Sequence, residues 1–112
     1  MSDKPILIDH KNGNKEWLLN GKLHREDGPA YETPYGLNKW YLNGLPHRVD
    51  GPAYEDGIGY KAWYLNGLRH RVDGPAYESP FGYKEWWLNG VLYFSEYNNE
   101  RYFYISGKKY ER

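Results

Sequence analysis

Residues 17–32 spell WLLNGKLHREDGPAYE, and the pattern returns as WYLNGLPHRVDGPAYE at residues 40–55 and as WYLNGLRHRVDGPAYE at residues 63–78. The copies begin 23 residues apart, and no insertion separates them. Self-similarity at one short period is typical of proteins that stack a single supersecondary unit on itself. The spacing therefore predicts a single repeat-array domain over residues 1–112.

Each copy carries the signature of a β-hairpin. An alternating stretch leads into Asn-Gly, the dipeptide that most strongly favours a two-residue hairpin turn. Such a turn fixes the register, so that Trp17 faces His24 and Glu16 faces Arg25. We expect Trp17, Leu19, His24 and their equivalents to form a constant inner face, with aromatic side chains supplying the core.

The Asp-Gly-Pro after each hairpin predicts a break in the second strand. Glycine adopts positive φ without strain, proline cannot donate to a ladder, and aspartate bonds its own backbone two residues on. We expect a bulge or bend in a long strand that resumes at Ala-Tyr-Glu. A second turn, residues 33–36 in the first copy, returns the chain to the next Trp. The predicted fold is all-β: an antiparallel meander of stacked β-hairpin repeats, with two strands per 23 residues.

The ends depart from the repeat, as terminal units of a stacked array usually do. Residues 6–9 fall one period before residues 29–32, which predicts half a repeat at the N-terminal end. The fourth copy begins faithfully at residues 82–90 and then loses the His, the Arg and the Asp-Gly-Pro. The predicted units are an N-terminal half-repeat cap at 1–13, repeats at 14–36, 37–59 and 60–82, and a degenerate repeat with a C-terminal cap at 83–112.

Composition argues against several functions. Lys plus Arg equals Asp plus Glu at 15 each, so no net charge favours nucleic acid. The absence of cysteine rules out a disulfide framework and thiolate chemistry, and it suits a reducing compartment. The apolar run near the start, residues 6–8, is too short for a signal peptide or a membrane span. We expect a cytoplasmic protein that binds neither nucleic acid nor membranes.

The pattern W-x-L-N-G-x-x-H resembles the MORN repeat, a β-hairpin unit of about this period with an aromatic strand, an N-G turn and a following H-G-x-G. The likeness covers residues 13–107. One extra residue precedes Asn-Gly and H-R-x-D-G-P replaces H-G-x-G, so the chain resembles a variant class, similar to hairpin-repeat proteins of phage and giant-virus genomes. The resemblance implies a binding role, usually as a protein scaffold and sometimes at membranes, and no catalysis. Trp-Tyr-Leu-Asn at 40–43 and 63–66 is also similar to the choline-binding cell-wall repeats of surface proteins.

Two aromatic regions are candidates for binding a protein. The face opposite the Trp row differs between copies. It is either a second core layer, if the sheet curls over itself, or an exposed strip for a partner. The C-terminal aromatic cluster, which includes Phe103 and Ile105, either closes the last hairpins or forms an open edge that pairs with a second copy, and we favour the homodimer. The predicted partner-binding residues are Leu18, Tyr41, Tyr64, Trp87, Tyr93, Phe94, Tyr97, Tyr102 and Tyr104.

A competing hypothesis places a small ligand on two rows of the repeat. Arginine suits bidentate recognition of phosphate or carboxylate, which makes the rows candidates for an anionic, nucleotide-like molecule. Aromatic faces are candidates for a cation or a sugar. The rows are Arg25, Arg48 and Arg71 together with His24, His47 and His70.

Both rows also have structural interpretations. Each Arg would pair with the Asp two residues later, or bind carbonyl groups of a neighbouring unit, and so hold the Asp-Gly-Pro bend. Each His would pack, neutral, against its cross-strand Trp. The acidic residues Asp9, Glu32, Glu55 and Glu78 would balance the arginines between units. No metal site is predicted, because equivalent residues of successive hairpins lie roughly 10 Å apart whereas nitrogen ligands lie ~2 Å from zinc.

Catalysis is not predicted either. Acid–base or nucleophilic chemistry needs different groups that converge, and here equivalent groups recur in rows. No phosphate loop, G-x-S-x-G or metal signature is present, and no cofactor is predicted. The sequence predicts a non-enzymatic protein–protein interaction module, which the resemblance makes a viral inhibitor or adaptor of a host protein. Sequestration of a small ligand is the alternative.

Overall fold

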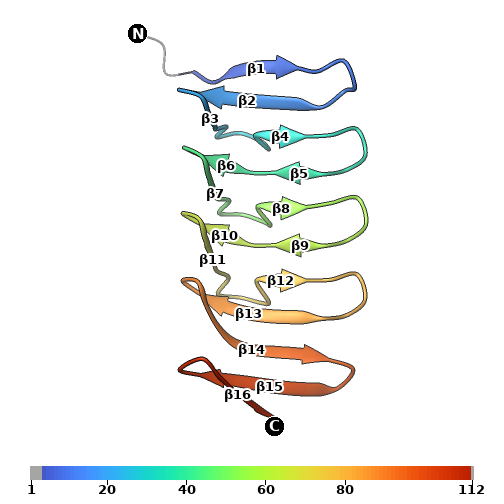
Figure 1. The fold of residues 1–112 in the computed structure, drawn as a ribbon, viewed down its shortest axis with the longest axis vertical. Helices are drawn as coiled ribbons and strands as arrows, with labels where there is room; N and C mark the ends of the chain where they lie inside the picture. Colours follow the sequence, from blue (N-terminus) through green and yellow to red (C-terminus); the bar gives the residue numbers. More distant parts are fainter. Residues whose placement is uncertain (1–3, 112) are drawn as a thin grey trace.

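The computed structural model describes residues 4–111, and the described chain is all-β, without a helix (Figure 1). All strand pairs are antiparallel, as predicted for a meander of β-hairpins. The predicted first and last units extend into residues 1–3 and 112, which lie outside the described residues. The strands are β1 (Ile6–Asp9), β2 (Lys15–Leu19), β3 (Lys22–Leu23), β4 (Tyr31–Glu32), β5 (Asn38–Lys39), β6 (Tyr41–Leu42), β7 (Leu45–Pro46), β8 (Tyr54–Glu55), β9 (Lys61–Ala62), β10 (Tyr64–Leu65), β11 (Leu68–Arg69), β12 (Tyr77–Glu78), β13 (Lys84–Leu88), β14 (Val91–Tyr97), β15 (Glu100–Ile105) and β16 (Lys108–Glu111).

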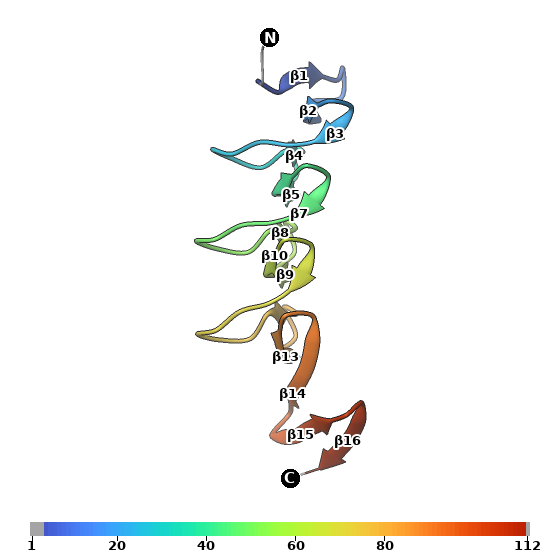
Figure 2. The ribbon, with the colours of Figure 1, turned by 90° about the vertical axis from the view of Figure 1, so that its left-hand side faces the viewer.

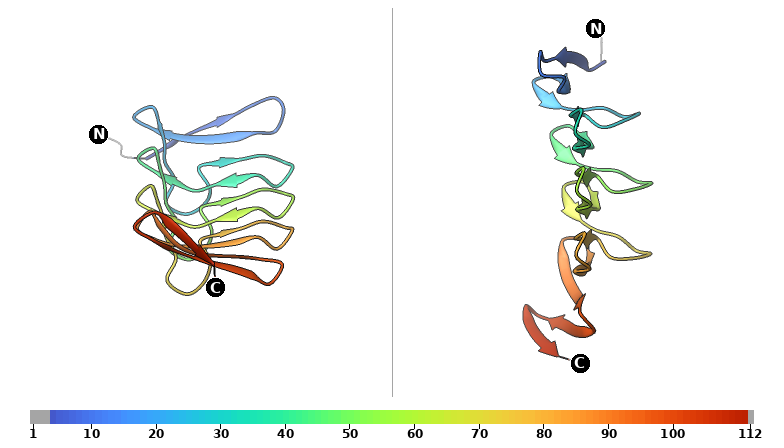
Figure 3. Two further views of the ribbon diagram at one scale, coloured as in Figure 1. Left: turned by 60° about the horizontal axis from the view of Figure 1, so that its bottom comes forward. Right: turned by 90° about the vertical axis from the view of Figure 1, so that its right-hand side faces the viewer.

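The strands form one layer rather than a sandwich or a closed barrel. A 12-stranded sheet runs from β1 to β16, and β6–β7 and β10–β11 form separate two-stranded hairpins beside it. The molecule measures 53 × 29 × 20 Å, and Figure 2 and the right-hand view of Figure 3 show a single sheet edge-on from its two opposite sides. Within residues 4–111 no second layer covers either face. The varying face therefore is not buried beneath another sheet.

The buried centre consists of small residues, which corrects the expectation of an aromatic core. No large side chain among the described residues is fully buried. Aromatic rings lie on the two faces of the sheet, half-covered by their neighbours, because a single layer cannot enclose them. The buried residues between strands include Ala30, Ala53, Ala62, Ala76 and Ser95.

The Asn-Gly turns adopt the conformation expected for two-residue hairpins. In the first copy φ is +52° at Asn20 and +78° at Gly21, and the later copies repeat these values closely. Positive φ at both central residues defines a type I′ turn, whose twist matches that of the flanking strands. Leu18 faces Leu23 across this turn, in the register that the turn predicts.

The second strand of each hairpin leaves the sheet. The Trp17 carbonyl accepts a hydrogen bond from the His24 amide (2.9 Å), and the Trp17 amide donates to the Ala30 carbonyl (2.8 Å). The chain therefore leaves the sheet and returns to it beside the same tryptophan. The residues between them form a projecting loop, and Figure 2 shows the three loops leaving the sheet on one side. The projecting loops are residues 25–29, 48–52 and 71–75.

These loops overturn two expectations about register. Glu16 faces Tyr31 and not Arg25, because the chain turns away from its own hairpin after His24 and the Arg25 amide donates to the Tyr41 carbonyl of the next unit (3.0 Å). The acidic row does not balance the arginines. Instead it alternates with lysines and an asparagine across the strands, a pattern in which opposite charges are direct neighbours. This row consists of Asp9, Lys15, Glu32, Asn38, Glu55, Lys61, Glu78, Lys84, Glu96 and Arg101.

Directly paired residues share a face of the sheet and successive residues alternate, which defines two faces. We call the side with the tryptophans Trp17, Trp40, Trp63 and Trp86 and the projecting loops the loop face. The other side is the tyrosine face. Its central row consists of Glu16, Tyr31, Lys39, Tyr54, Ala62, Tyr77, Glu85 and Ser95.

Within residues 83–111 the fourth unit has no projecting loop. Strand β14 runs without interruption apart from a register shift opposite Trp86 and Trp87. On the loop face Phe94 lies between Trp86 and Phe103, with ring centroids 5.0 Å away on each side. Aromatic packing thus takes the place that arginine holds in the earlier units.

Candidate binding surfaces

On the loop face an arginine lies over the tryptophan of each of the first three units, Trp17, Trp40 and Trp63. The Arg25 guanidinium carbon is 3.8 Å from the Trp17 ring centroid, and the second and third units repeat this at 3.9 and 4.0 Å. The Arg25 Nε donates to Asp27 (3.0 Å) and Nη1 donates to the Pro29 carbonyl (3.2 Å). Each arginine side chain therefore binds its own projecting loop, whereas its backbone amide donates to a carbonyl of the next unit, that of Tyr41 in the case of Arg25 (3.0 Å). Stacking and charge-assisted hydrogen bonds together hold the loop against the sheet.

The glycine of Asp-Gly-Pro is required by this arginine. A Cβ on Gly51 would lie 2.8 Å from the guanidinium carbon of Arg48, a distance that real Cβ atoms do not show. Gly51 does not adopt positive φ, and neither do Gly28 and Gly74. The expectation of a positive-φ position was therefore wrong. Glycine is needed because the guanidinium lies directly on the backbone.

Each histidine connects its unit to the next. The His24 Nδ1 accepts a hydrogen bond from the amide of Asn43 in the following Asn-Gly turn (2.9 Å), and His47 and His70 repeat this with the next two turns. An accepting Nδ1 carries no proton. The histidine and arginine rows thus both make contacts that build the fold.

The tyrosine face contains a shallow hollow in the third unit. Its volume is about 220 Å³, and Tyr54 and Tyr77 stand on either side of Ala62, their direct cross-strand neighbour. Ala62 is only 3% exposed and forms the floor. The other units carry Glu16, Lys39 and Glu85 at this position, and the small side chain of Ala62 makes room for the hollow in the third unit. The rest of its wall includes Lys39, Tyr41, Tyr64 and Arg69.

Arg69 places a fixed cation beside the hollow. Its guanidinium carbon lies 5.3, 5.1 and 5.2 Å from the ring centroids of Tyr64, Tyr77 and Trp87. Nη2 donates to the Tyr64 hydroxyl (2.7 Å), and Nη1 is 3.5 Å from a Glu85 carboxylate oxygen. Arg69 is specific to the third unit, because the equivalent residues in the other units are leucine or proline.

Three tyrosines of this face, Tyr54, Tyr77 and Tyr83, have raised pKa values and keep their protons at neutral pH. Burial raises the pKa of Tyr77 above its ordinary value, and it does the same for Tyr54, where Asp56 adds to the effect. Burial also raises the pKa of Tyr83, which donates a hydrogen bond to Glu85 (2.6 Å). The face therefore presents neutral phenols that can donate hydrogen bonds.

The predicted partner-binding residues do not form one surface. Tyr41 and Tyr64 line the hollow, and Trp87 lies next to it against Arg69. Leu18 is at the far end of the same face, opposite Leu23. Phe94 points to the loop face, where it packs against Trp86.

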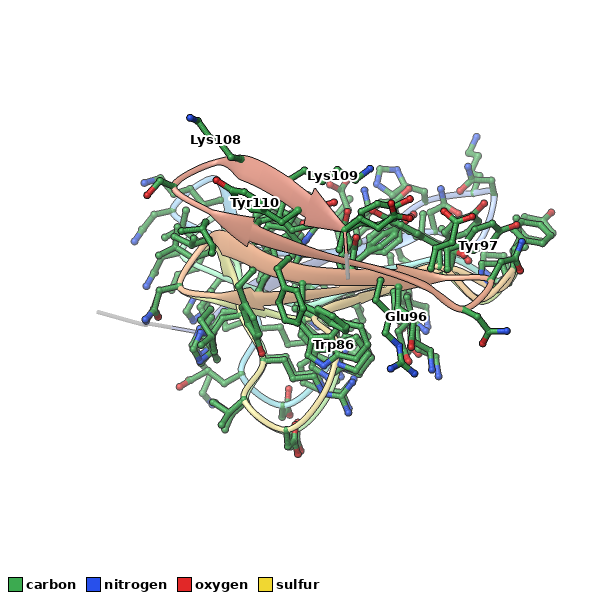
Figure 4. All side chains as sticks on the ribbon, turned by 90° about the horizontal axis from the view of Figure 1, so that it is seen from below. Trp86, Glu96, Tyr97, Lys108, Lys109 and Tyr110 are labelled. Carbon is green, nitrogen blue, oxygen red and sulfur yellow. The ribbon has the colours of Figure 1, made fainter. Side chains whose placement is uncertain are left out.

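The C-terminal residues of that set lie beyond the third unit. Figure 4 shows Trp86 and Glu96 on one side of the last strands and Tyr97 on the other. Tyr97 is 43% exposed, and Tyr93 is the half-buried residue at the register shift. The Tyr102 hydroxyl donates to Glu100 (2.7 Å), and this hydrogen bond raises its pKa to about 12. The Tyr104 hydroxyl lies 3.0 Å from that of Ser95.

Sequence reasoning missed three residues of the hollow: Tyr54, Tyr77 and Arg69. The two tyrosines belong to the Ala-Tyr-Glu that every repeat shares, so they were interpreted as residues that the fold needs and not as binding residues. The strand that contains Ala-Tyr-Glu pairs with a Trp-containing strand on each side. Working out this register from the sequence would have placed Tyr54 and Tyr77 beside Ala62. Arg69 could have been found as the one charged residue at its repeat position.

No protein-family model, curated protein or solved structure matches the chain. Across residues 4–111, His, Asp and Glu side chains form no group of three or more that could hold a metal ion. The same part of the chain contains no helix long and apolar enough to cross a membrane.

Proposed function

We propose that the protein is a non-enzymatic protein-binding module whose tyrosine face receives an apolar segment of a protein partner. The hollow at Ala62 is the observation that carries this proposal. It lies between Tyr54 and Tyr77 on a face that no second layer covers. Tyrosine, tryptophan and arginine are the side chains that most often dominate binding at the centre of an interface.

The size of the hollow favours a protein over a small ligand. At about 220 Å³ it is smaller than typical ligand pockets, which measure roughly 300–1,000 Å³. It can accept one or two side chains of a partner. An anionic small molecule at the arginine and histidine rows remains the second candidate, and it would compete with Asp27, Asp50 and Asp73 for the arginines.

The proposed biological role and cellular location rest on composition and on the resemblance to known repeat proteins. The likeness to hairpin-repeat proteins of phages and giant viruses extends the proposal to an inhibitor or adaptor of a host protein. The lack of cysteine supports a reducing compartment such as the cytoplasm. A homodimer through the C-terminal end also remains part of the proposal. Antiparallel pairing of β16 with a second copy would set Lys108 opposite the second copy's Glu111, a favourable charge pair.

Filling the hollow tests the proposal. Ala62→Glu introduces the residue that the first and fourth units carry at this position, so the fold is expected to tolerate it. Immobilised wild-type protein and the variant would be compared by quantitative mass spectrometry of captured host proteins. We expect a specific partner whose capture falls about tenfold in the variant, equivalent to ~1.4 kcal/mol. Ile58→Ser, on an exposed turn, is the matched control and should capture the partner normally. Equal capture by wild type and Ala62→Glu would contradict the proposal.

A further inference from the structure

The projecting loops border two grooves on the loop face, on the opposite side of the sheet from the hollow at Ala62. The groove between loops 25–29 and 48–52 has a volume of about 510 Å³, and the groove between loops 48–52 and 71–75 about 520 Å³. Trp63 and Leu65 line the second groove, and their equivalents Trp40 and Leu42 line the first. Figure 3 shows the loops that bound them projecting at regular intervals.

The loops are held rigid although they add no strand to the sheet. Arg48 fixes the middle loop by stacking on Trp40 and by binding Asp50 and the Pro52 carbonyl. A direct turn would join the same strands with fewer residues. Loops that a scaffold holds in one conformation are frequent binding elements, because little entropy is lost when a ligand binds.

The rims of the grooves are apolar and negatively charged. Val49 and Val72 at the loop tips are 84% and 80% exposed. The side chains of Asp27, Asp50 and Asp73 are 81–88% exposed, whereas the arginines that pair with them are only 21–25% exposed. The accessible charge is therefore acidic, and it complements a basic ligand.

The spacing of the grooves matches one backbone conformation. Successive units are two strands apart, which corresponds to ~9.6 Å. A polyproline II helix has three residues per turn and a rise of ~3.1 Å, so every third side chain recurs on one face at ~9.3 Å. Aromatic-lined grooves are a known mode of recognition for such segments.

We propose that the loop face binds a basic, proline-rich segment in the polyproline II conformation. One apolar side chain enters each groove and contacts the Trp and Leu at its base. Lysine or arginine of the segment pairs with the exposed carboxylates of Asp50 and Asp73. This site lies on the opposite face from the hollow at Ala62 and is independent of it.

Fluorescence anisotropy with a labelled peptide tests the proposal. The probe is Leu-Pro-Pro-Leu-Pro-Pro-Leu-Arg-Lys, compared with a peptide of equal composition whose leucines are no longer three apart. We expect saturable binding that is about tenfold weaker for the rearranged peptide. The double variant Val49→Ser/Val72→Ser should weaken binding of the first peptide by a similar factor. The fold is expected to tolerate it, because both valines are exposed and the first unit carries the polar Glu26 at the same position. Ile58 is also an exposed aliphatic residue but lies on the other side of the unit, so the Ile58→Ser variant should bind the peptide as the wild type does.

Several outcomes would overturn the inference. These are no saturation at millimolar peptide, equal binding of the two peptides, or equal binding by the valine variant. Amide chemical shifts provide a second measurement. We expect changes in residues 48–52 and 70–73 and none at Tyr54 and Tyr77, whereas changes confined to the two tyrosines would place the peptide on the wrong face. The Ala62→Glu variant should bind the peptide normally, which separates this test from that of the proposed function.

Discussion

The two faces of the sheet differ in how closely the repeats agree. On the loop face the first three units are nearly identical: a tryptophan, an arginine stacked on it and a glycine beneath the guanidinium. On the tyrosine face the same units differ. The position of Ala62 is otherwise glutamate or lysine, and that of Arg69 is otherwise leucine or proline.

The contrast teaches which residues the fold needs. A single-layer sheet has no enclosed core, so each unit must hold its own loop and bind the next unit through local contacts. Those contacts recur because every unit needs them. Residues that differ between units are free of this requirement, and the hollow at Ala62 arises among them.

The largest effect is expected from removing an arginine of the loop face. Arg48→Leu loses the stack on Trp40, the ion pair with Asp50 and the hydrogen bond to the Pro52 carbonyl. We expect the free energy of unfolding, measured by urea titration, to fall by roughly 2–4 kcal/mol. Proteolysis should begin within residues 48–52. A loss below about 0.5 kcal/mol, the usual limit for an unimportant surface change, would contradict this role.

The glycine beneath the arginine is expected to have the next largest effect. Gly51→Ala introduces a Cβ 2.8 Å from the Arg48 guanidinium carbon and should displace it. We expect a loss of about 1–3 kcal/mol in the unfolding free energy. The control is the double variant: in the Arg48→Leu background the added methyl group should cost little. Additive losses would show that the arginine is not what the glycine accommodates.

Removing one link between units should have a smaller effect. His47→Phe leaves the Asn66 amide without its acceptor, which should cost about 1 kcal/mol. Hydrogen exchange at the Asn66 amide should accelerate correspondingly. His47→Asn offers a carbonyl oxygen near the position of Nδ1 and should restore much of the protection. If both variants exchange at the wild-type rate, the histidine does not connect the units.

The turns on the edge belong to neither face and should contribute least. Desolvation raises the pKa of Asp56, but hydrogen bonds from the amides of Ile58, Tyr60 and Gly59 outweigh it, and the net pKa is lowered. The carboxylate therefore stabilises the fold above its unfolded pKa of ~3.9. This contribution is lost as the pH falls through the lower folded value. Solvent screening limits it to below about 1 kcal/mol. The next unit carries Ser79 at the position of Asp56, so Asp56→Ser should be tolerated. In this variant the free energy of unfolding should depend less on pH below pH ~4, and an unchanged pH dependence would contradict the role given to Asp56.

Local signals in the sequence predicted the hairpins because their chemistry is local. Asn20-Gly21 specifies a type I′ turn within two residues, and the turn fixes Leu18 opposite Leu23. The Asp-Gly-Pro signal correctly marked an interruption, but a bulge and a projecting loop begin with the same residues. Only the pairing of Trp17 with both His24 and Ala30 distinguishes them.

The candidate site was predictable only in part. The alternation of the strand placed Tyr41 and Tyr64 on the face opposite the tryptophans, and both line the hollow there. The contributions of Tyr77 and Arg69 depend on which strands become neighbours and on whether the sheet closes over itself. Both are decided by contacts between units that no short stretch of sequence contains.

Arg69 and Arg71 allow the most direct test of the division between the faces, since they are two residues apart and belong to opposite faces. Arg69→Leu introduces the leucine found in the first and fourth units, and Arg71→Leu removes the stack on Trp63. Unfolding free energy and partner capture would be measured for both variants. We predict that Arg69→Leu loses the partner but lowers the unfolding free energy by only about 1–2 kcal/mol, because Glu85 keeps its hydrogen bonds from Tyr83 and Trp87. Arg71→Leu should lose roughly 2–4 kcal/mol and still bind the partner when folded. Equal destabilisation by the two changes, or full binding by Arg69→Leu, would contradict the account.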